Sequence, residues 1–137
     1  MALITDMTRD CEGILQVGSG KITGDECVQA SRRAMLLFQN ARNFRYEFVD
    51  FSNVTELEFN QEHLAQVKEQ DRAIAAARPN AVVVIVAPRD DFYQIGKRWE
   101  HEVRELGLST HVARDRMEAL DWLHQILPAR RNEERAV

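Results

Sequence analysis

The sequence predicts an α/β fold with a mostly parallel five-stranded sheet, and two observations support this prediction. The first is the run 81–86, which has only apolar side chains, most of them β-branched. Such residues favour strands, and the lack of polar alternation indicates a strand covered on both faces by helices. The second is that strand patterns alternate with helix patterns in the order β-β-α-β-α-β-α-β-α. The initial pair of strands adds one antiparallel edge strand.

Composition excludes several classes of function. The 137 residues carry a net charge of −4 without a basic cluster, so we expect no nucleic-acid partner. No apolar run approaches the ~18 residues of a spanning helix, so we expect no membrane insertion. Cys11 and Cys27 form no disulfide framework and no signal-peptide pattern is present, so a cytoplasmic location is expected. We expect one domain over residues 1–128 and a flexible charged tail over residues 129–137.

Turn and capping patterns predict the first two strands and the first helix. Apolar runs at 2–7 and 13–18, separated by a short polar segment, predict a hairpin. The glycines that follow lack the spacing of a phosphate-binding loop, so they indicate a bend or bulge in the strand. Thr23 and Glu26 have capping-box spacing, which predicts the start of the first helix.

The middle of the chain is predicted to contain a strand, a polar loop and a second helix. The strand covers residues 46–51 and leads into a loop over residues 50–55. Asn60 has the position of an N-cap for the helix. Asp71 lies on or beside the inner stripe of this helix, either as an exposed edge position or as a buried functional carboxylate. The other residues of that stripe are Leu64, Val67, Ile74 and Ala75.

Two more helices and one strand complete the predicted fold. Asp90 or Asp91 is expected to cap a third helix that ends at Gly107, because glycine is favoured just past a helix end. A strand over residues 109–113 follows. The last helix is expected to end before Pro128. Its predicted buried face contains Met117, Leu120 and Leu123.

No pattern of catalytic or metal-binding residues stands out. The four histidines lie on different predicted elements without metal-ligand spacing, and no nucleophile elbow is present. We therefore expect no metal, no cofactor and no catalytic residues. In open parallel sheets, ligands and partners bind outside the carboxyl ends of the strands. Polar residues expected there form a candidate site, although they also suit ordinary turns and helix caps: Ser52, Asn53, Thr55, Arg89 and Asp90.

Three segments resemble the STAS superfamily, the sulfate-transporter and anti-sigma-factor-antagonist domain. They are residues 20–23 before the first helix, residues 50–55 after the third strand, and residues 118–123 near the end. The resemblance covers residues 3–127 and is greatest to small stand-alone bacterial proteins grouped with STAS and CRAL-TRIO-like domains. It implies a STAS-like fold and a regulatory role that depends on binding another protein.

One departure from this family changes the expected function. Anti-sigma-factor antagonists of the family carry an Asp-Ser-Ser-Gly stretch at the start of the second helix, where a partner kinase phosphorylates a serine. Here residues 58–61 read Glu-Phe-Asn-Gln, so no hydroxyl is present to accept a phosphoryl group. We therefore expect a module without the phosphorylation switch that still docks another protein near Asn60.

Two functions from different classes remain open. The first is a non-enzymatic regulatory or interaction module that binds a partner protein or a second copy of the chain as a homodimer. Its predicted binding residues are Ser52, Asn53, Thr55, Glu58, Asn60 and Glu62. The second, implied by the CRAL-TRIO grouping, is a carrier or sensor of a small molecule or lipid in a pocket between helices and sheet. Arg89 and Asp90 are its predicted ligand-binding residues.

Overall fold

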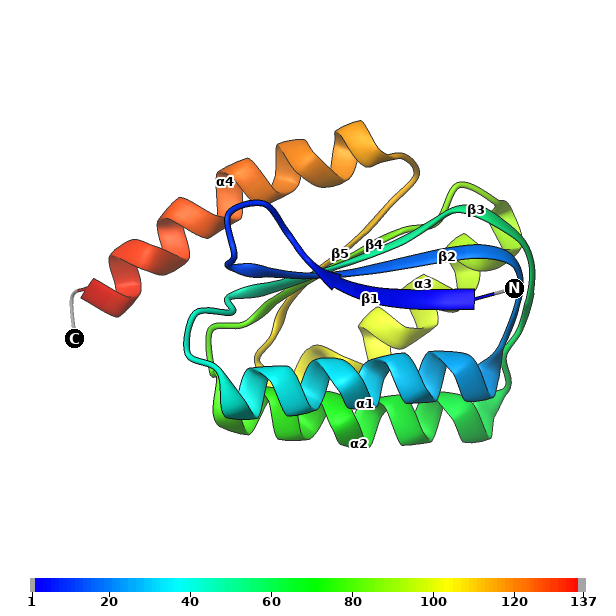
Figure 1. Cartoon of the computed structure of the whole chain (residues 1–137), viewed down its shortest axis with the longest axis horizontal. Coiled ribbons are helices and arrows are strands. Elements are labelled where there is room, and N and C mark those ends of the chain that lie inside the picture. Colours follow the sequence, from blue (N-terminus) through cyan, green and yellow to red (C-terminus); the bar gives the residue numbers. More distant parts are fainter. Residues whose placement is uncertain (1, 136–137) are drawn as a thin grey trace.

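A single twisted sheet with helices on both faces forms the molecule (Figure 1). The computed structural model describes residues 2–135, with side-chain environments for residues 3–128. The strands of the five-stranded sheet lie in chain order: β1 (Ala2–Met7), β2 (Gly13–Thr23), β3 (Tyr46–Glu58), β4 (Val82–Val86) and β5 (Ser109–Ala113). The helices are α1 (Gly24–Asn40), α2 (Gln61–Ala77), α3 (Asp90–Val103), the short 3-10 helix η1 (Arg104–Leu106) and α4 (Arg116–Arg135). The predicted element order and fold class are confirmed.

The sheet is parallel except at one edge, as the sequence predicts. β1 and β2 form an antiparallel hairpin in which Leu3 lies opposite Gly18. All other neighbouring strands run parallel. α1, α2 and α3 cover one face of the sheet, and α4 crosses the other face (Figure 1). These connections match the crossover topology that parallel strands require.

β4 occupies the inner position that its apolar sequence predicts. Val82, Val84 and Val86 have no exposed surface and pack toward α4. Val83 and Ile85 pack on the opposite side, with α1, α2 and α3. Both faces of the strand are therefore removed from water, which explains why polar residues are missing from it.

The helix starts are stabilised by side-chain caps at two of the predicted positions. Thr23 and Glu26 form the predicted capping box at the start of α1. Asn60 caps α2, and the reciprocal partner is His63, whose Nδ1 accepts a hydrogen bond from the Asn60 backbone N–H at 3.1 Å. The predicted cap of α3 is wrong: its N-cap is Arg89, which makes no side-chain cap bond, and both aspartates lie in the first turn. Acidic groups there still favour the positive end of the helix dipole.

β2 and β3 continue together beyond the rest of the sheet. β4 pairs with β3 only from Tyr46 to Asp50, whereas β2 follows β3 as far as Glu58. Two register shifts interrupt this pairing, on either side of Gly20, whose φ of 67° suits glycine. At each shift the extra residue lies on β3, because Asp50 to Asn53 lies opposite Val17 to Ser19 and Val54 to Glu56 lies opposite Gly20 to Lys21. The bulges are therefore on β3, and the expectation of a bulge in β2 is wrong. We call residues 18–23 with residues 51–58 the β2–β3 ribbon.

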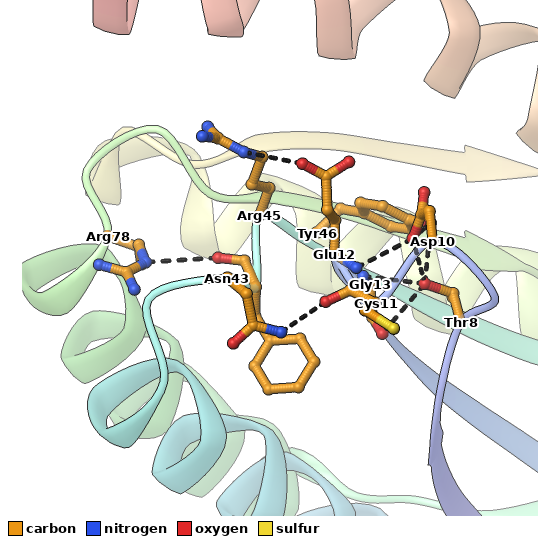
Figure 2. Close-up of polar contacts among 10 residues, drawn as sticks. Thr8, Asp10, Cys11, Glu12, Gly13, Asn43, Arg45, Tyr46 and Arg78 are labelled. Carbon is orange, nitrogen blue, oxygen red and sulfur yellow. Dashed lines mark hydrogen bonds and ion pairs between the residues drawn. The ribbon is translucent and has the colours of Figure 1, made fainter.

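At the opposite end of the sheet, a compact turn joins β1 to β2 (Figure 2). The Thr8 hydroxyl oxygen accepts a hydrogen bond from the Gly13 N–H at 2.9 Å, and the Tyr46 hydroxyl donates to the Asp10 carboxylate at 3.0 Å. A Cβ atom on Gly13 would lie 2.3 Å from the Tyr46 ring, so a side chain does not fit there. Cys11 adopts a left-handed φ of 63° in this turn. The polar residues of the turn therefore hold one another and the start of β3.

An arginine closes the neighbouring connection between α1 and β3. Arg78 donates hydrogen bonds to the carbonyl oxygens of Ala41 at 2.8 Å and Phe44 at 3.3 Å. Arg45 pairs with Glu12 at 3.3 Å. The loops at this end of the sheet are thus bound to one another by side chains from α2, β3 and the hairpin.

α4 departs from its predicted form in length and in its buried face. The sequence predicts that α4 ends before Pro128, but the helix continues past this proline to Arg135. Residues 136–137 of the predicted tail lie outside the described residues. A proline lacks the backbone N–H, so the helix loses one hydrogen bond at Pro128. The helix can still continue, because the proline ring holds φ near the helical value. Met117 and Leu120 are exposed rather than buried, because α4 lies over β4 and β5 and turns only a narrow stripe toward them. Ala119 and Leu123 form that stripe.

Replacing Val84 by alanine tests the central position of β4. The valine has no exposed surface, so the substitution removes buried methyl groups and leaves a void. We expect a loss of about 2 kcal/mol in the free energy of unfolding, measured by urea denaturation. The matched control is Leu36→Ala on α1, where the side chain is 43% exposed. It should change the free energy by less than about 0.5 kcal/mol. Equal losses would show that β4 is not the packed centre.

Candidate functional site

The residues predicted to form a binding loop lie instead on a strand. Ser52, Asn53, Thr55 and Glu58 belong to β3, which runs without interruption to Glu58. The predicted loop over residues 50–55 is therefore wrong. The physical reason is that β2 also continues, so its backbone groups pair with those of this polar segment. The four side chains are exposed on the β2–β3 ribbon.

Arg89 ties the loop after β4 to the ribbon. Its Nη1 donates a hydrogen bond to the Thr55 carbonyl oxygen at 2.7 Å, and its guanidinium pairs with Asp91 at 3.2 Å. The structure thus brings Arg89 and Thr55 together, as the candidate site requires. Asp90 turns elsewhere and pairs with Arg114, after β5, at 2.7 Å. The guanidinium of Arg89 is consequently already bound to groups of the protein.

The starts of α1 and α2 meet beside the ribbon. His63 packs so closely on Gly24 that a Cβ atom there would lie 2.0 Å from the ring. The same ring pairs with Asp25 at 3.3 Å. Asn60 and Glu62 are exposed in this region, next to the end of β3. The predicted binding residues from Ser52 to Glu62 are therefore exposed along the end of β3 and at the start of α2.

A cavity lies between the sheet and the three helices α1, α2 and α3. Its volume is about 90 Å³, and most of its lining is apolar. Two acidic side chains, Glu47 from β3 and Asp71 from α2, border it. They are 6% and 3% exposed, respectively, so both carboxyl groups lie inside the protein. Neither was expected as a site residue, although a buried Asp71 was one of the two interpretations of its position; the exposed interpretation is wrong.

Burial controls the protonation of both carboxyl groups. Burial raises the pKa of Glu47 to about 8, and the nearby charge of Asp71 adds to the increase, while a hydrogen bond from Gln16 opposes it. Burial likewise raises the pKa of Asp71 to about 7, opposed by a hydrogen bond from Trp99. The indole N–H of Trp99 donates to Asp71 Oδ2 at 2.7 Å. The pair therefore holds protons at pH values where exposed carboxyl groups are ionised.

A chain of hydrogen bonds connects this pair to the edge of the sheet. The Gln16 side-chain amide donates to Glu47 Oε2 at 3.3 Å and to the Ala30 carbonyl oxygen at 2.9 Å. The Gln16 carbonyl oxygen accepts from the Thr5 hydroxyl at 2.6 Å, and Thr5 also accepts from Arg33. Polar groups on β1, β2 and α1 thus support the position of Glu47.

The sequence contained a signal for each buried acid. Glu47 lies in a predicted strand that is mostly apolar, between Tyr46 and Phe48. Asp71 lies between Val67 and Ile74 on the inner stripe of α2. What the sequence could not provide is their proximity, because it depends on how α2 packs over β3.

Within the part of the chain that the structure describes, no three His, Cys, Asp or Glu side chains are arranged to hold a metal ion. No helix among these residues is long and apolar enough to cross a bilayer. No protein-family model and no curated protein sequence matches the chain. A solved structure does match: that of the anti-sigma factor antagonist SpoIIAA in its unphosphorylated form, with a TM-score of 0.54 and 14% sequence identity. The match covers 90% of this chain and 98% of that chain.

The chain has a STAS-like fold. The expectation drawn from the three sequence segments is thereby confirmed at the level of architecture. An identity of 14% establishes a shared fold, and functions differ widely within one fold. The features of this fold that bear on function are the surface at the end of β3 and the cavity between the sheet and the helices.

The raised pKa values predict how stability depends on pH. The folded state retains a proton on Glu47 that the unfolded chain releases above about 4.5, so stability should fall as the pH rises from about 4.5 to 8. Glu47→Gln removes the ionisation while keeping the side-chain shape. We expect this variant to be more stable than the parent protein at pH 8 by at least about 2 kcal/mol, with little difference near pH 4.

Chemical denaturation at the two pH values measures this effect. The matched control is Glu58→Gln, which changes an exposed glutamate on the same strand. The control should keep the parent protein's loss of stability between pH 4 and pH 8. An equal effect of both substitutions would contradict the role of burial at Glu47.

Proposed function

We propose that the protein is a non-enzymatic interaction module that binds a partner protein along the β2–β3 ribbon and the start of α2. The observation that supports this most directly is the edge of β3. β4 pairs with β3 only as far as Asp50, so among the described residues no strand pairs with residues 51–58 on that side. Strand edges of this kind can accept a strand from another protein.

The side chains along this edge favour a partner of particular charge. Glu56, Glu58 and Glu62 are exposed, and Lys21 pairs with Glu56 only at 3.8 Å on the surface. Exposed charges discourage indiscriminate pairing of strand edges, since like-charged copies repel. They also favour a partner that presents basic residues, because complementary charge increases the rate and specificity of association.

The likeness to an anti-sigma factor antagonist supports a regulatory use of such a surface. In anti-sigma-factor antagonists a partner kinase phosphorylates a serine at the start of the second helix, whereas residues 58–61 here carry no hydroxyl group. The proposed regulation therefore does not depend on phosphorylation there. In its place, Asn60 caps α2 through the His63 backbone N–H at 3.1 Å. In this proposal the end of β3 and the start of α2 serve as a fixed docking point.

A second candidate function is the binding of a small molecule, which the cavity between the sheet and α1–α3 favours. A mostly apolar cavity with a few polar groups is the usual form of a ligand site. The ligand-binding role expected of Arg89 and Asp90 is less well supported, since both form ion pairs within the protein and neither borders the cavity.

Charge reversal tests the interaction proposal. The variant Glu58→Lys/Glu62→Lys should reduce recovery of a specific partner from native lysate by at least about tenfold, because it places positive charge against a basic partner. Recovery is measured by quantitative mass spectrometry after affinity capture, and cross-links to residues 52–62 should identify the same partner.

A control variant with the same net charge separates the effect of the position of the charges from the effect of the total charge. Glu69→Lys/Asp121→Lys changes two exposed acidic residues on α2 and α4, away from the ribbon. It should recover the partner as the parent protein does. A partner retained by the ribbon variant, or lost equally from both variants, would exclude the proposed surface.

A further inference from the structure

The cavity beside Glu47 and Asp71 contains two acidic groups without a basic counterpart. Its volume is about 90 Å³, and no lysine, arginine or histidine is among the residues that border it. A buried acid normally has a basic partner or retains a proton, because an isolated charge is costly inside a protein. A cation supplied from outside would remove this cost.

The remaining walls of the cavity suit a cation with an apolar tail. Four aromatic side chains border it: Phe51, Phe59, Phe92 and Trp99. Aromatic faces attract cations, and more strongly where water is excluded. Ser31 also borders the cavity, and its hydroxyl oxygen is buried without a hydrogen-bond partner in the protein. A hydrogen-bond donor bound in the cavity could satisfy this oxygen as well as the two carboxylates.

We propose that this cavity binds a small alkylammonium ion, with the ammonium group at Glu47 and Asp71 and the alkyl chain against the aromatic wall. The volume of about 90 Å³ limits the ligand to a few carbon atoms, on the scale of butylamine. The proposal rests on the second candidate function, small-molecule binding, and specifies its chemical class. It does not depend on a protein partner at the ribbon.

Binding should be coupled to the release of protons. At neutral pH the pair retains protons, and a singly charged ammonium ion would replace one of them. The other titratable group at the cavity is Cys27, whose pKa burial raises to about 12, so its thiol stays neutral. An alkylammonium ion keeps its charge up to a pH of about 10. Its affinity should therefore increase by about tenfold from pH 6 to pH 8.

The two tryptophans of the chain allow the site to be observed directly. Trp99 donates its indole N–H to Asp71, whereas Trp122 stacks on His111 at a centroid distance of 5.2 Å, outside the cavity. In an NMR titration of the ¹⁵N-labelled full chain with butylammonium chloride, the Trp99 indole signal should shift saturably at pH 8. The Trp122 signal should not shift.

Two probes of the same shape separate charge from apolar fit. Butanol and sodium butyrate should bind at least about tenfold more weakly than butylammonium. Glu47→Gln should weaken butylammonium binding by at least about tenfold, while Glu58→Gln should not change it. An unchanged Trp122 signal verifies that each variant is folded.

Each alternative result has a distinct meaning. Butanol binding as tightly as butylammonium would overturn the amine proposal and leave a carrier of neutral molecules. A preference for butyrate would reverse the assigned charge. No saturable shift with any probe would exclude the cavity as a ligand site of this size. None of these results changes partner capture at the ribbon, so the interaction proposal is judged separately.

Discussion

The burial of β4 on both faces is the constraint on which the rest of the structure depends. A strand of valine and isoleucine gains most when neither face contacts water, so helices must lie on both sides of the sheet. Parallel pairing with β3 and β5 then requires crossover helices, and α2 and α3 supply them. The hairpin of β1 and β2 extends this sheet at one edge. The arrangement in Figure 1 follows from this one strand and its neighbours.

Features that depend on neighbouring residues in the chain could be predicted from the sequence. The capping box at Thr23 and the N-cap at Asn60 each involve contacts within a few residues. Gly107 also ends a helix as expected, although the helix it caps is η1, since α3 itself ends at Val103. The strand over residues 109–113 and the central strand are also found where the patterns place them. Local chemistry determines all of these positions.

Features that depend on tertiary pairing could not be predicted in the same way. A strand ending at Phe51 is reasonable for the polar segment that follows, because the continued pairing with β2 is invisible in a local pattern. Met117 and Leu120 fit a buried helix stripe, and their exposure results from the path of α4 across β4 and β5. Asp71 could be placed on the inner stripe of α2, but its contact with Trp99 depends on the packing of α3.

The position of α4 has a consequence for how the chain is made. Among the described residues, α4 is the helix that covers the face of the sheet formed by Val82, Val84 and Val86, and it comes after the five strands in the chain. During synthesis, therefore, each strand leaves the ribosome before the element that shields this face. At a typical rate of ~5–20 residues per second, the valine side chains stay open to solvent for roughly seconds. Apolar surface exposed in this way makes a nascent chain prone to aggregate until the last helix packs.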